Sequence, residues 1–397
     1  MKEVVLHNLK EGMIVAEDVM TKGGQRILEK GRVLNKQSIM RLSFYNIKSA
    51  MVEDPDEERD TNVSDAPKAS EIPEVPKTPE VPEAPVKRPA PASIAKPEKP
   101  AAPAPKAYSQ TIKTSTKFKS FQIDHTIALT SIKNIFEGYV NNGVAPDTKA
   151  LLSTVLGIFN SCKTSLELFN MLHNMHSSKD SIYSHSFNVA LICRQLGKWL
   201  KFDDQTLDTL TIAGLLHDIG KLKVPAEILD KPDKYTDEEF QLVKMHTQYG
   251  FDLLRSLPLD ERIKKAALSH HERCDGTGYP MKLTQDDTDD FAMIVAIADV
   301  YDAMTTARSY RAPLCPFQVI DNFEKDGLQK YKPQFILTFL GHIAGTYQNH
   351  RVLLNDGRSA NIVMLNQKHL SRPLVQLDDN SCIDLTTTPD LFIKAVL

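Results

Sequence analysis

Histidines and aspartates interrupt strongly apolar stretches of this sequence at several separate places. Two of these places hold adjacent pairs, His217-Asp218 and His270-His271, and three hold single residues. The full set is His185, His217, Asp218, His246, His270, His271 and Asp299. Burial of so many imidazoles and carboxylates without partners would cost several kcal/mol for each charged group. A shared metal centre removes that cost, and histidine with carboxylate but without thiolate suits Fe, Mn, Ni, Co or Zn.

The pair His217-Asp218 stands at the end of a predicted apolar helix that begins near residue 204. Successive residues on a helix point about 100° apart, so two adjacent side chains can face one ion only where the helix ends or bends. Gly220 provides such a break. Alone, this dipeptide would equally fit a buried histidine beside a capping aspartate. The other five candidate ligands favour the metal site.

Three longer motifs resemble those of the HD-GYP family, the bacterial cyclic di-GMP phosphodiesterase branch of the HD superfamily. They are His217-Asp-Ile-Gly-Lys221, His270-His-Glu-Arg-Cys-Asp-Gly-Thr-Gly-Tyr-Pro280 and Ala298-Asp-Val-Tyr-Asp-Ala-Met-Thr-Thr-Ala-Arg-Ser-Tyr-Arg311. The motifs follow one another in the family's order within residues 175–340. Residues 1–54 also resemble the small domain of unknown function that often precedes HD-GYP domains.

The resemblance implies a mainly α protein with an all-helical, metal-dependent phosphodiesterase core. Its substrate would be cyclic di-GMP, hydrolysed to linear pGpG, with GMP as a further product left open. Two alternatives remain: an enzyme of the same family that acts on another cyclic dinucleotide, and a non-catalytic receptor that binds cyclic di-GMP and signals through protein contacts. Nothing in the residue spacing itself specifies guanine.

Carried across the motifs, the resemblance makes all seven residues of the first set metal ligands, with Asp218 bridging two ions. Family members with three ions carry a glutamate four residues before the first ligand histidine, where this sequence has Ser181. A serine hydroxyl is a poor ligand, and Asp180 is one residue out of register. We therefore predict two divalent ions, with Fe or Mn favoured and Ni, Co or Zn as alternatives.

Asp218 and Lys221 are the implied catalytic residues. The implied contacts to the substrate are Lys221, Tyr279, Arg308 and Arg311. The two arginines are three residues apart and so share one side of a helix end, where a guanidinium suits phosphate; surface ion pairs are the alternative for both. The family's loop, at 275–280 here, borders the substrate and has been linked to GGDEF-domain proteins, which are therefore predicted partners.

Other polar residues near these motifs receive structural interpretations. Asp302 is predicted to cap or orient the helix of Asp299 rather than to bind metal. Glu272 and Arg273 are predicted to support the ligands from behind or to form a salt bridge. His173 is predicted to be a packing or surface residue, and His125 matches no motif.

Proline marks the division of the chain into domains. Of its 23 prolines, 13 fall between Pro55 and Pro105, and no aromatic residue occurs from Met51 to Ala107. Such a segment cannot bury enough apolar surface to fold, and its composition favours an extended spacer. We predict four parts: a docking or regulatory domain at 1–54, a linker at 55–117, a helical phosphodiesterase domain at 118–348 and a small β appendage at 349–397.

Apolar residues at intervals of three and four predict helices through most of the third part. The predicted ranges are 118–139, 148–176, 181–201, 204–218, 236–255, 259–270, 289–307 and 316–326. In the last part, alternation around Asn355-Asp-Gly357 predicts a hairpin of strands at 351–354 and 359–365, with a third strand at 374–377. The first domain is predicted to be α/β or β, with strands at 13–16 and 47–52 on either side of a short helix.

Composition excludes several classes of protein. The longest apolar run, Phe291–Ala298, is eight residues long, against about 20 for a membrane span, and no secretory signal is evident. Five cysteines without a CxxC pair do not support a disulfide framework or a thiolate zinc site. The net charge of -3 argues against a nucleic-acid polymer as partner. We predict a cytoplasmic location, and the helices at 118–176 are long enough for a homodimer interface.

Overall fold

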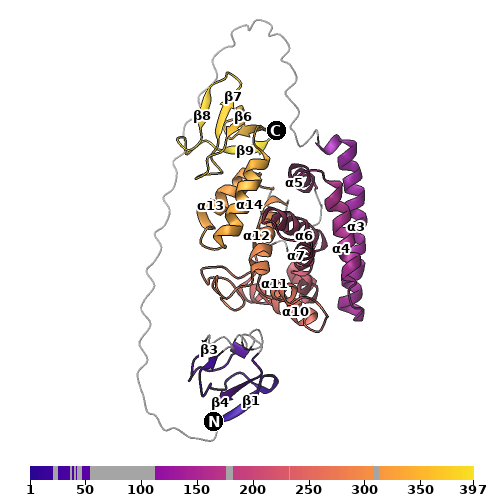
Figure 1. Ribbon diagram of the computed structural model, residues 1–397, viewed down its shortest axis with the longest axis vertical. Coiled ribbons are helices and arrows are strands. Elements are labelled where there is room, and N and C mark those ends of the chain that lie inside the picture. Colours follow the sequence, from indigo (N-terminus) through magenta and orange to yellow (C-terminus); the bar gives the residue numbers. More distant parts are fainter. Residues whose placement is uncertain are drawn as a thin grey trace, which may run out of the picture. The chain divides into compact units, whose positions relative to one another are not determined.

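The computed structural model, shown in Figure 1, describes residues 1–20, 26–35, 38–39, 42, 47–53, 112–175, 182–231, 233–306 and 313–397. The chain divides into two units, Met1–Pro105 and Lys106–Leu397. Each unit has its own cluster of buried apolar side chains, and the two clusters share no residue. Ser181, Arg308, Arg311 and most of the predicted linker lie outside the described residues.

The first unit contains two small antiparallel sheets. They pair β1 (Lys2–Val5) with β4 (Ser49–Val52), and β2 (Val19–Met20) with β3 (Arg26–Leu28). A short 3-10 helix, η1 (Leu6–Asn8), follows β1. β4 confirms most of the strand predicted at 47–52, whereas residues 13–16 form only isolated bridges to Val33 and Val52. Of the helix predicted between these strands, residues 38, 39 and 42 are described and are helical.

A helical hairpin opens the second unit. α3 (Thr116–Asn142) begins after Ser115, whose hydroxyl accepts a hydrogen bond from a backbone N–H, and ends at Gly143, which adopts the left-handed conformation. α4 (Thr148–Ser161) begins after Asp147. The buried side chains of α3 are Phe118, Phe121, His125, Ala128, Ile132 and Phe136. The single helix predicted at 148–176 is two helices, because Thr164 caps a separate α5 (Ser165–Asn174).

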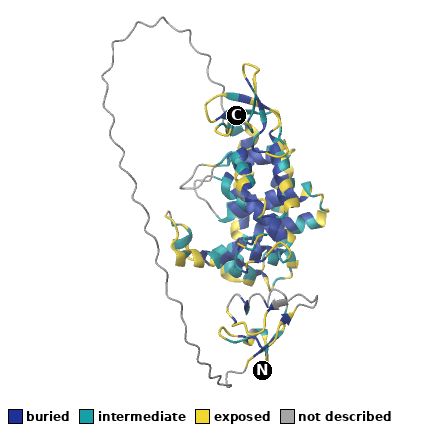
Figure 2. Ribbon diagram, turned by 90° about the vertical axis from the view of Figure 1, so that its left-hand side faces the viewer, coloured by how far each residue is buried: buried dark blue, intermediate teal, exposed yellow. Residues whose placement is uncertain are grey.

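Helices α6 to α12 follow, and buried residues predominate in α6, α7, α11 and α12, at the centre of the unit in Figure 2. Their bounds are α6 (Ile182–Trp199), α7 (Asp204–Leu216), η2 (Ile219–Lys223), α8 (Ala226–Leu229), α9 (Asp237–Lys244), α10 (His246–Leu254), α11 (Glu261–Ser269) and α12 (Asp290–Thr305). The helix predicted at 236–255 is interrupted at Met245, so that His246 begins α10. Across the described ranges, no helix has both the length and the apolar character needed to cross a membrane.

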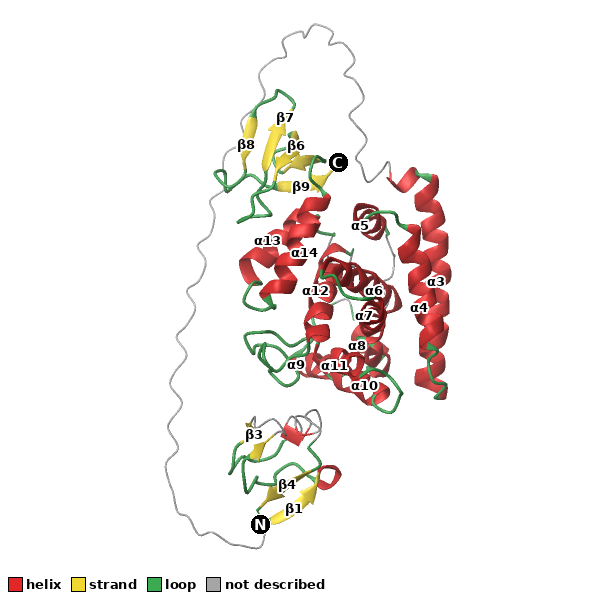
Figure 3. Ribbon diagram, in the orientation of Figure 1, coloured by secondary structure: helices red, strands yellow, loops and turns green. Residues whose placement is uncertain are grey.

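The chain continues with α13 (Pro316–Asp326) and α14 (Pro333–Thr346) and then forms a five-stranded antiparallel sheet (Figure 3). The strands lie in the order β8 (Cys382–Asp384), β7 (Leu374–Leu377), β6 (Ser359–Met364), β5 (Arg351–Leu354) and β9 (Ile393–Val396). The three predicted strands are confirmed, and β8 and β9 extend the sheet at its two edges. Val352, Ile362 and Val375 belong to the same buried cluster as the helices, so the sheet packs on the helical core.

Candidate metal centre

The seven predicted ligands come from different helices and turns of the second unit and meet at one place. His185 lies on α6, His217 and Asp218 join α7 to η2, His246 begins α10, His270 and His271 follow α11, and Asp299 lies on α12. All except His271 are buried, and the side chain of His271 is 18% exposed. The fold therefore brings together side chains that are far apart in the sequence.

Asp218 is the side chain that the other candidate ligands share. Its Oδ2 lies 3.4 Å from Nε2 of His185 and 3.3 Å from Nε2 of His217. Its Oδ1 lies 3.3 Å from Nε2 of His246 and 3.7 Å from Nε2 of His270. Two groups result, one of His185, His217 and Asp218 and one of Asp218, His246, His270 and His271, and the ligand atoms of each group lie within 4.8 Å of one another. Membership of both groups is what a carboxylate that bridges two ions requires.

Backbone carbonyls set the orientation of three of these histidines. The Nδ1–H groups of His217, His246 and His270 donate to the carbonyls of Gly214, Val243 and Ala266, at 2.7, 2.6 and 3.0 Å. A neutral imidazole with its proton on Nδ1 presents a lone pair at Nε2. All three Nε2 atoms therefore face Asp218 as potential metal donors.

Two buried polar atoms at this place have no hydrogen-bond partner in the described part of the chain: Nε2 of His217 and Oδ1 of Asp218. Buried polar atoms in native proteins are nearly always satisfied, so both atoms require a partner that these residues do not supply. A divalent cation satisfies a neutral imidazole nitrogen and a carboxylate oxygen together. The donor set therefore fits a metal centre.

The ionisation states of these groups also suit cation binding. Burial opposes ionisation of Asp218, but Lys221 and the surrounding histidines outweigh it and hold the pKa of the carboxyl well below its usual value. Burial lowers the pKa of His246 to about 4, and burial with neighbouring histidines puts the pKa values of His270 and His271 well below the usual range. An ionised carboxylate and neutral imidazoles near pH 7 are the forms in which these groups bind metal.

His185 is held by aspartates on both sides of its ring. Its Nδ1 donates to Oδ2 of Asp302 at 2.8 Å, and its Nε2 lies 3.0 Å from Oδ1 of Asp299. Burial opposes protonation of His185, but these two carboxylates outweigh it and raise its pKa to about 10, so a cation bound at Nε2 would displace a proton. Asp302 thus orients a candidate ligand, a more specific role than capping or orienting the helix of Asp299.

Lys221 extends toward the shared carboxylate. Its Nζ lies 2.5 Å from Oδ2 of Asp218, and its side chain is 24% exposed, so it connects the buried site with the surface. Gly220 lets this turn approach α10: a Cβ at Gly220 would lie 1.9 Å from the carbonyl oxygen of His246 and 2.3 Å from the backbone nitrogen of Gly250. The sequence predicts only a helix break at Gly220. The structure adds that no residue other than glycine permits this close contact.

The loop that follows His271 places an aromatic ring beside the candidate ligands, next to two side chains of α9. The ring of Tyr279 stacks on that of His271 with centroids 4.6 Å apart. Nζ of Lys244 lies 5.8 Å from the centroid of Tyr279, and the ring of Phe240 lies 6.5 Å from the same centroid. Of the predicted phosphate and substrate contacts, Lys221 and Tyr279 therefore lie at the site, whereas the two arginines fall outside the described residues.

Glu272 and Arg273 hold this loop against the ligand pair. The carboxylate of Glu272 accepts hydrogen bonds from the N–H groups of Met281 and Leu283, and burial raises its pKa to about 7. The guanidinium of Arg273 donates to the carbonyls of His270 and Glu272. Of the two roles predicted for this pair, support from behind the ligands agrees with these contacts.

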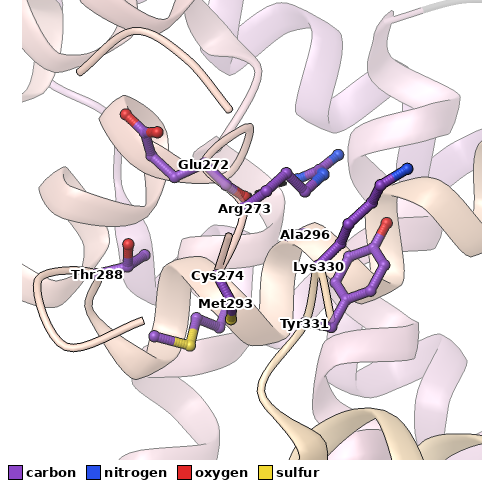
Figure 4. A pocket seen from close by; sticks show the side chains of 8 residues that line it. All are labelled: Glu272, Arg273, Cys274, Thr288, Met293, Ala296, Lys330 and Tyr331. Carbon is purple, nitrogen blue, oxygen red and sulfur yellow. Dashed lines mark hydrogen bonds between the residues drawn. The ribbon is translucent and has the colours of Figure 1, made fainter. Parts of the chain in front are cut away.

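A small cavity lies behind the same segment (Figure 4). Its lining residues are Glu272, Arg273, Cys274, Thr288, Met293, Ala296, Lys330 and Tyr331. Its volume is about 10 Å³, which admits no more than a single water molecule. A nucleotide therefore does not bind in this cavity.

Helices that carry a His-Asp pair and further histidines around one carboxylate define a metal-binding domain of the HD type. Residues 170–335 match the model of a family described as the HD domain. Over these residues the chain is therefore similar to the HD domain, and its motifs at 217–221 and 270–280 resemble those of the HD-GYP branch.

Curated proteins with named activities are similar to part of this chain. This chain is 41% identical over 141 residues to a cyclic di-GMP phosphodiesterase of Pseudomonas aeruginosa, and the match covers 35% of this chain and 34% of the relative. Over 183 residues, 45% of this chain and 35% of the relative, it is 32% identical to 3'3'-cGAMP-specific phosphodiesterase 2 of Vibrio cholerae. Over 177 residues, 44% of this chain and 48% of the relative, it is 33% identical to a cyclic di-GMP phosphodiesterase of Thermotoga maritima. The chain therefore spans between a third and a half of the length of these relatives.

Proposed function

We propose that the second unit is a metal-dependent phosphodiesterase that hydrolyses cyclic di-GMP to linear pGpG. The observation that carries the proposal is the sharing of Asp218 by two groups of histidines, in a domain whose relatives include two named cyclic di-GMP phosphodiesterases. Hydrolysis of a phosphodiester requires neutralisation of charge on the phosphoryl oxygens and a nucleophile. Divalent ions bound at this centre would supply both, as Lewis acids that also lower the pKa of water.

The proposed centre holds two ions, Fe or Mn, with Ni, Co or Zn as alternatives. The two ligand groups support this number, because each offers at least three donor residues. Asp299 lies beside both groups, with Oδ1 3.0 Å from His185 and Oδ2 3.9 Å from Nδ1 of His271, and so completes the proposed ligand set. Three tightly bound ions per chain, measured by elemental analysis after anaerobic purification, would contradict the dinuclear assignment.

Around the scissile phosphate, the chain's own residues would have separate tasks. Lys221, which contacts Asp218 and reaches the surface, would steady the phosphate or the departing oxygen. Tyr279 would line the substrate side, with Phe240 and Lys244 next to it. Arg308 and Arg311 would pair with the phosphates of the substrate, a role that follows from their place in the motif.

Hydrolysis of cyclic di-GMP is the direct test. Protein loaded anaerobically with Mn²⁺ or Fe²⁺ should convert cyclic di-GMP to pGpG, which chromatography separates from the substrate and from GMP. Metal-stripped protein is the control, and addition of the same ion should restore turnover. Loaded protein that binds cyclic di-GMP and leaves it intact would contradict the proposal in favour of a non-catalytic receptor.

A second substrate is favoured by the relative named for 3'3'-cGAMP. The same assay, run with cyclic di-GMP and with the cyclic GMP–AMP dinucleotide, gives kcat/KM for each. A larger value for the mixed dinucleotide would reassign the substrate while leaving the metal centre and the reaction unchanged.

For the first unit we propose a docking or regulatory role, since none of the seven candidate ligands lies in it. The proposed partners are GGDEF-domain proteins at the loop 275–280 and a second copy of the chain at the helices 116–174, and the proposed location is the cytoplasm. The four-part division into 1–54, 55–117, 118–348 and 349–397 is part of the same proposal.

Deletion of residues 1–106 should leave hydrolysis of cyclic di-GMP largely intact. The reason is that the apolar cluster of the second unit contains no residue of the first. The measurement compares kcat and KM of the truncated and full-length proteins at equal metal content. A truncated protein that folds with the helical content of the second unit but no longer turns over would show that the first unit takes part in catalysis.

A further inference from the structure

A chain of buried polar side chains leads from α3 to the candidate ligand His185. Nε2 of His125 on α3 lies 3.4 Å from Oδ1 of Asn188 on α6. Nδ2 of Asn188 lies 2.9 Å from Oδ1 of Asp302 on α12, and Oδ2 of Asp302 lies 2.8 Å from Nδ1 of His185. His125, Asn188 and Asp302 are 1%, 4% and 3% exposed. Three helices, α3, α6 and α12, are thus joined through buried polar side chains.

The hydrogen bonds of this chain converge on Asp302 from both sides. An ionised carboxylate only accepts, so Asp302 receives an N–H from the Asn188 amide and another from the His185 ring. The amide oxygen of Asn188 is then turned to His125, whose Nε2–H donates to it. Because the Nδ1 proton of His185 is directed to Asp302, its Nε2 faces Asp218 and Asp299. Each hydrogen bond therefore fixes the orientation of the next group.

Packing holds the members of the chain in place. The ring of His125 lies between Phe121 and Phe187, with centroids 5.8 and 5.0 Å away. Asn188 follows His185 by three residues on α6, so the two side chains share one side of the helix. The hydroxyl of Thr306 donates to Oδ1 of Asp302 at 3.2 Å, the oxygen that also accepts from Asn188. A buried polar group without a hydrogen-bond partner lowers the stability of the fold. Loss of one member therefore carries the additional free-energy cost of its unsatisfied neighbour.

We propose that His125, Asn188 and Asp302 are positioning residues that fix the ring of His185 for metal binding, which makes α3 a functional part of the metal centre. His125 precedes Asn188 by 63 residues and lies outside the matched range 170–335. Outer hydrogen-bond partners of this kind set the orientation and basicity of a ligand histidine, and their loss costs about 10- to 100-fold in metal affinity or activity. The proposal rests on the metal centre and holds whichever phosphoester is cleaved.

Two substitutions separate positioning from packing. His125→Phe keeps an aromatic ring beside Phe121 and Phe187 but removes the donor, and Asn188→Leu keeps the volume but removes both hydrogen bonds. Each variant is titrated with Co²⁺ against a chelator, and the visible absorption spectrum of the bound Co²⁺ reports the coordination of the ion. We expect Asn188→Leu to weaken binding about tenfold and to alter the spectrum. We expect a smaller change of the same kind from His125→Phe and its reversal in His125→Gln, whose amide again offers a donor.

The matched control is His173→Phe, because this histidine is also packed against α12. Its Nε2 lies 2.9 Å from the hydroxyl of Tyr301 and its Nδ1 lies 3.3 Å from that of Tyr347, so its hydrogen bonds lead to tyrosines and not to a ligand. The control should bind Co²⁺ with the affinity and spectrum of the unmodified protein.

Three results would overturn the proposal: unchanged Co²⁺ binding in both variants, an equal loss in the His173 control, or no recovery in His125→Gln. If circular dichroism shows that Asn188→Leu does not fold, the comparison of His125→Phe with His125→Gln decides alone. No substrate is present in these titrations, so their outcome is independent of whether cyclic di-GMP is hydrolysed.

Discussion

Turnover and metal binding are both expected to disappear when His217 and Asp218 are replaced together by alanine. The substitution removes one histidine from the first ligand group and the carboxylate common to both groups. Hydrolysis of cyclic di-GMP should fall to the uncatalysed background, and gel filtration should leave no ions bound. The helices should nevertheless fold, because the change also removes a buried negative charge, while Lys221 can turn its partly exposed side chain toward water.

The control for this double variant replaces an exposed histidine and an exposed aspartate, His369 and Asp379, with alanine. It changes the same residue types far from the candidate ligands in sequence and should keep the metal content and kcat of the unmodified protein. Cyclic di-GMP hydrolysis at the unmodified rate by the His217→Ala/Asp218→Ala protein would show that the site is wrongly assigned. An unfolded double variant would show instead that these residues are needed for the fold.

A single added methyl group, in Gly220→Ala, is expected to have the second largest effect. The new Cβ would overlap the carbonyl oxygen of His246 and the backbone of Gly250, so η2 and α10 must move apart. Overpacking of this kind lowers the free energy of unfolding by about 3 kcal/mol. Displacement of Asp218 relative to His246 by about 1 Å would in addition lower kcat about 100-fold. Urea denaturation and steady-state kinetics measure the two effects separately.

The matched control is Gly157→Ala on α4, where a Cβ would meet no atom within 4 Å. In an exposed helical position, alanine should raise the free energy of unfolding by about 0.5 to 1 kcal/mol relative to glycine and leave kcat unchanged. Gly220→Ala that is as stable and as active as this control would mean that the approach of η2 to α10 is not required.

The candidate ligands are accessible to sequence reasoning because each is a polar residue set in an otherwise apolar helix or at its end. His246 shows one limit of such reasoning. The residue itself is conspicuous in the sequence, but the helix break at Met245, which places His246 at the start of α10, is not. Asp302 illustrates another, because its partner His185 lies on a different helix. A hydrogen bond between residues so far apart depends on how helices cross, and local periodicity carries no information about that.

The same reasoning explains the outcome for the rest of the fold. Strands β5 and β6 are adjacent and joined by a turn with strong signals, so the hairpin is predictable. β8 and β9 are three and four residues long, and β9 pairs with β5 only after the chain has passed through the three other strands. The break between α4 and α5 depends on a single capping side chain, Thr164, within an apolar pattern that continues past it.

The reach of α3 determines where this chain can be cut and rejoined. Near its C-terminal end, the hydroxyl of Tyr139 donates to the carbonyl of Leu253 on α10, and Nζ of Lys223 donates to the carbonyl of Val140 at 3.2 Å. One helix thus meets the support of His185 through His125 and, about four turns later, the element that begins with His246. In a chimera that places a different domain before the second unit, a junction at residue 170 would discard both connections. A junction before Ile112 would keep them.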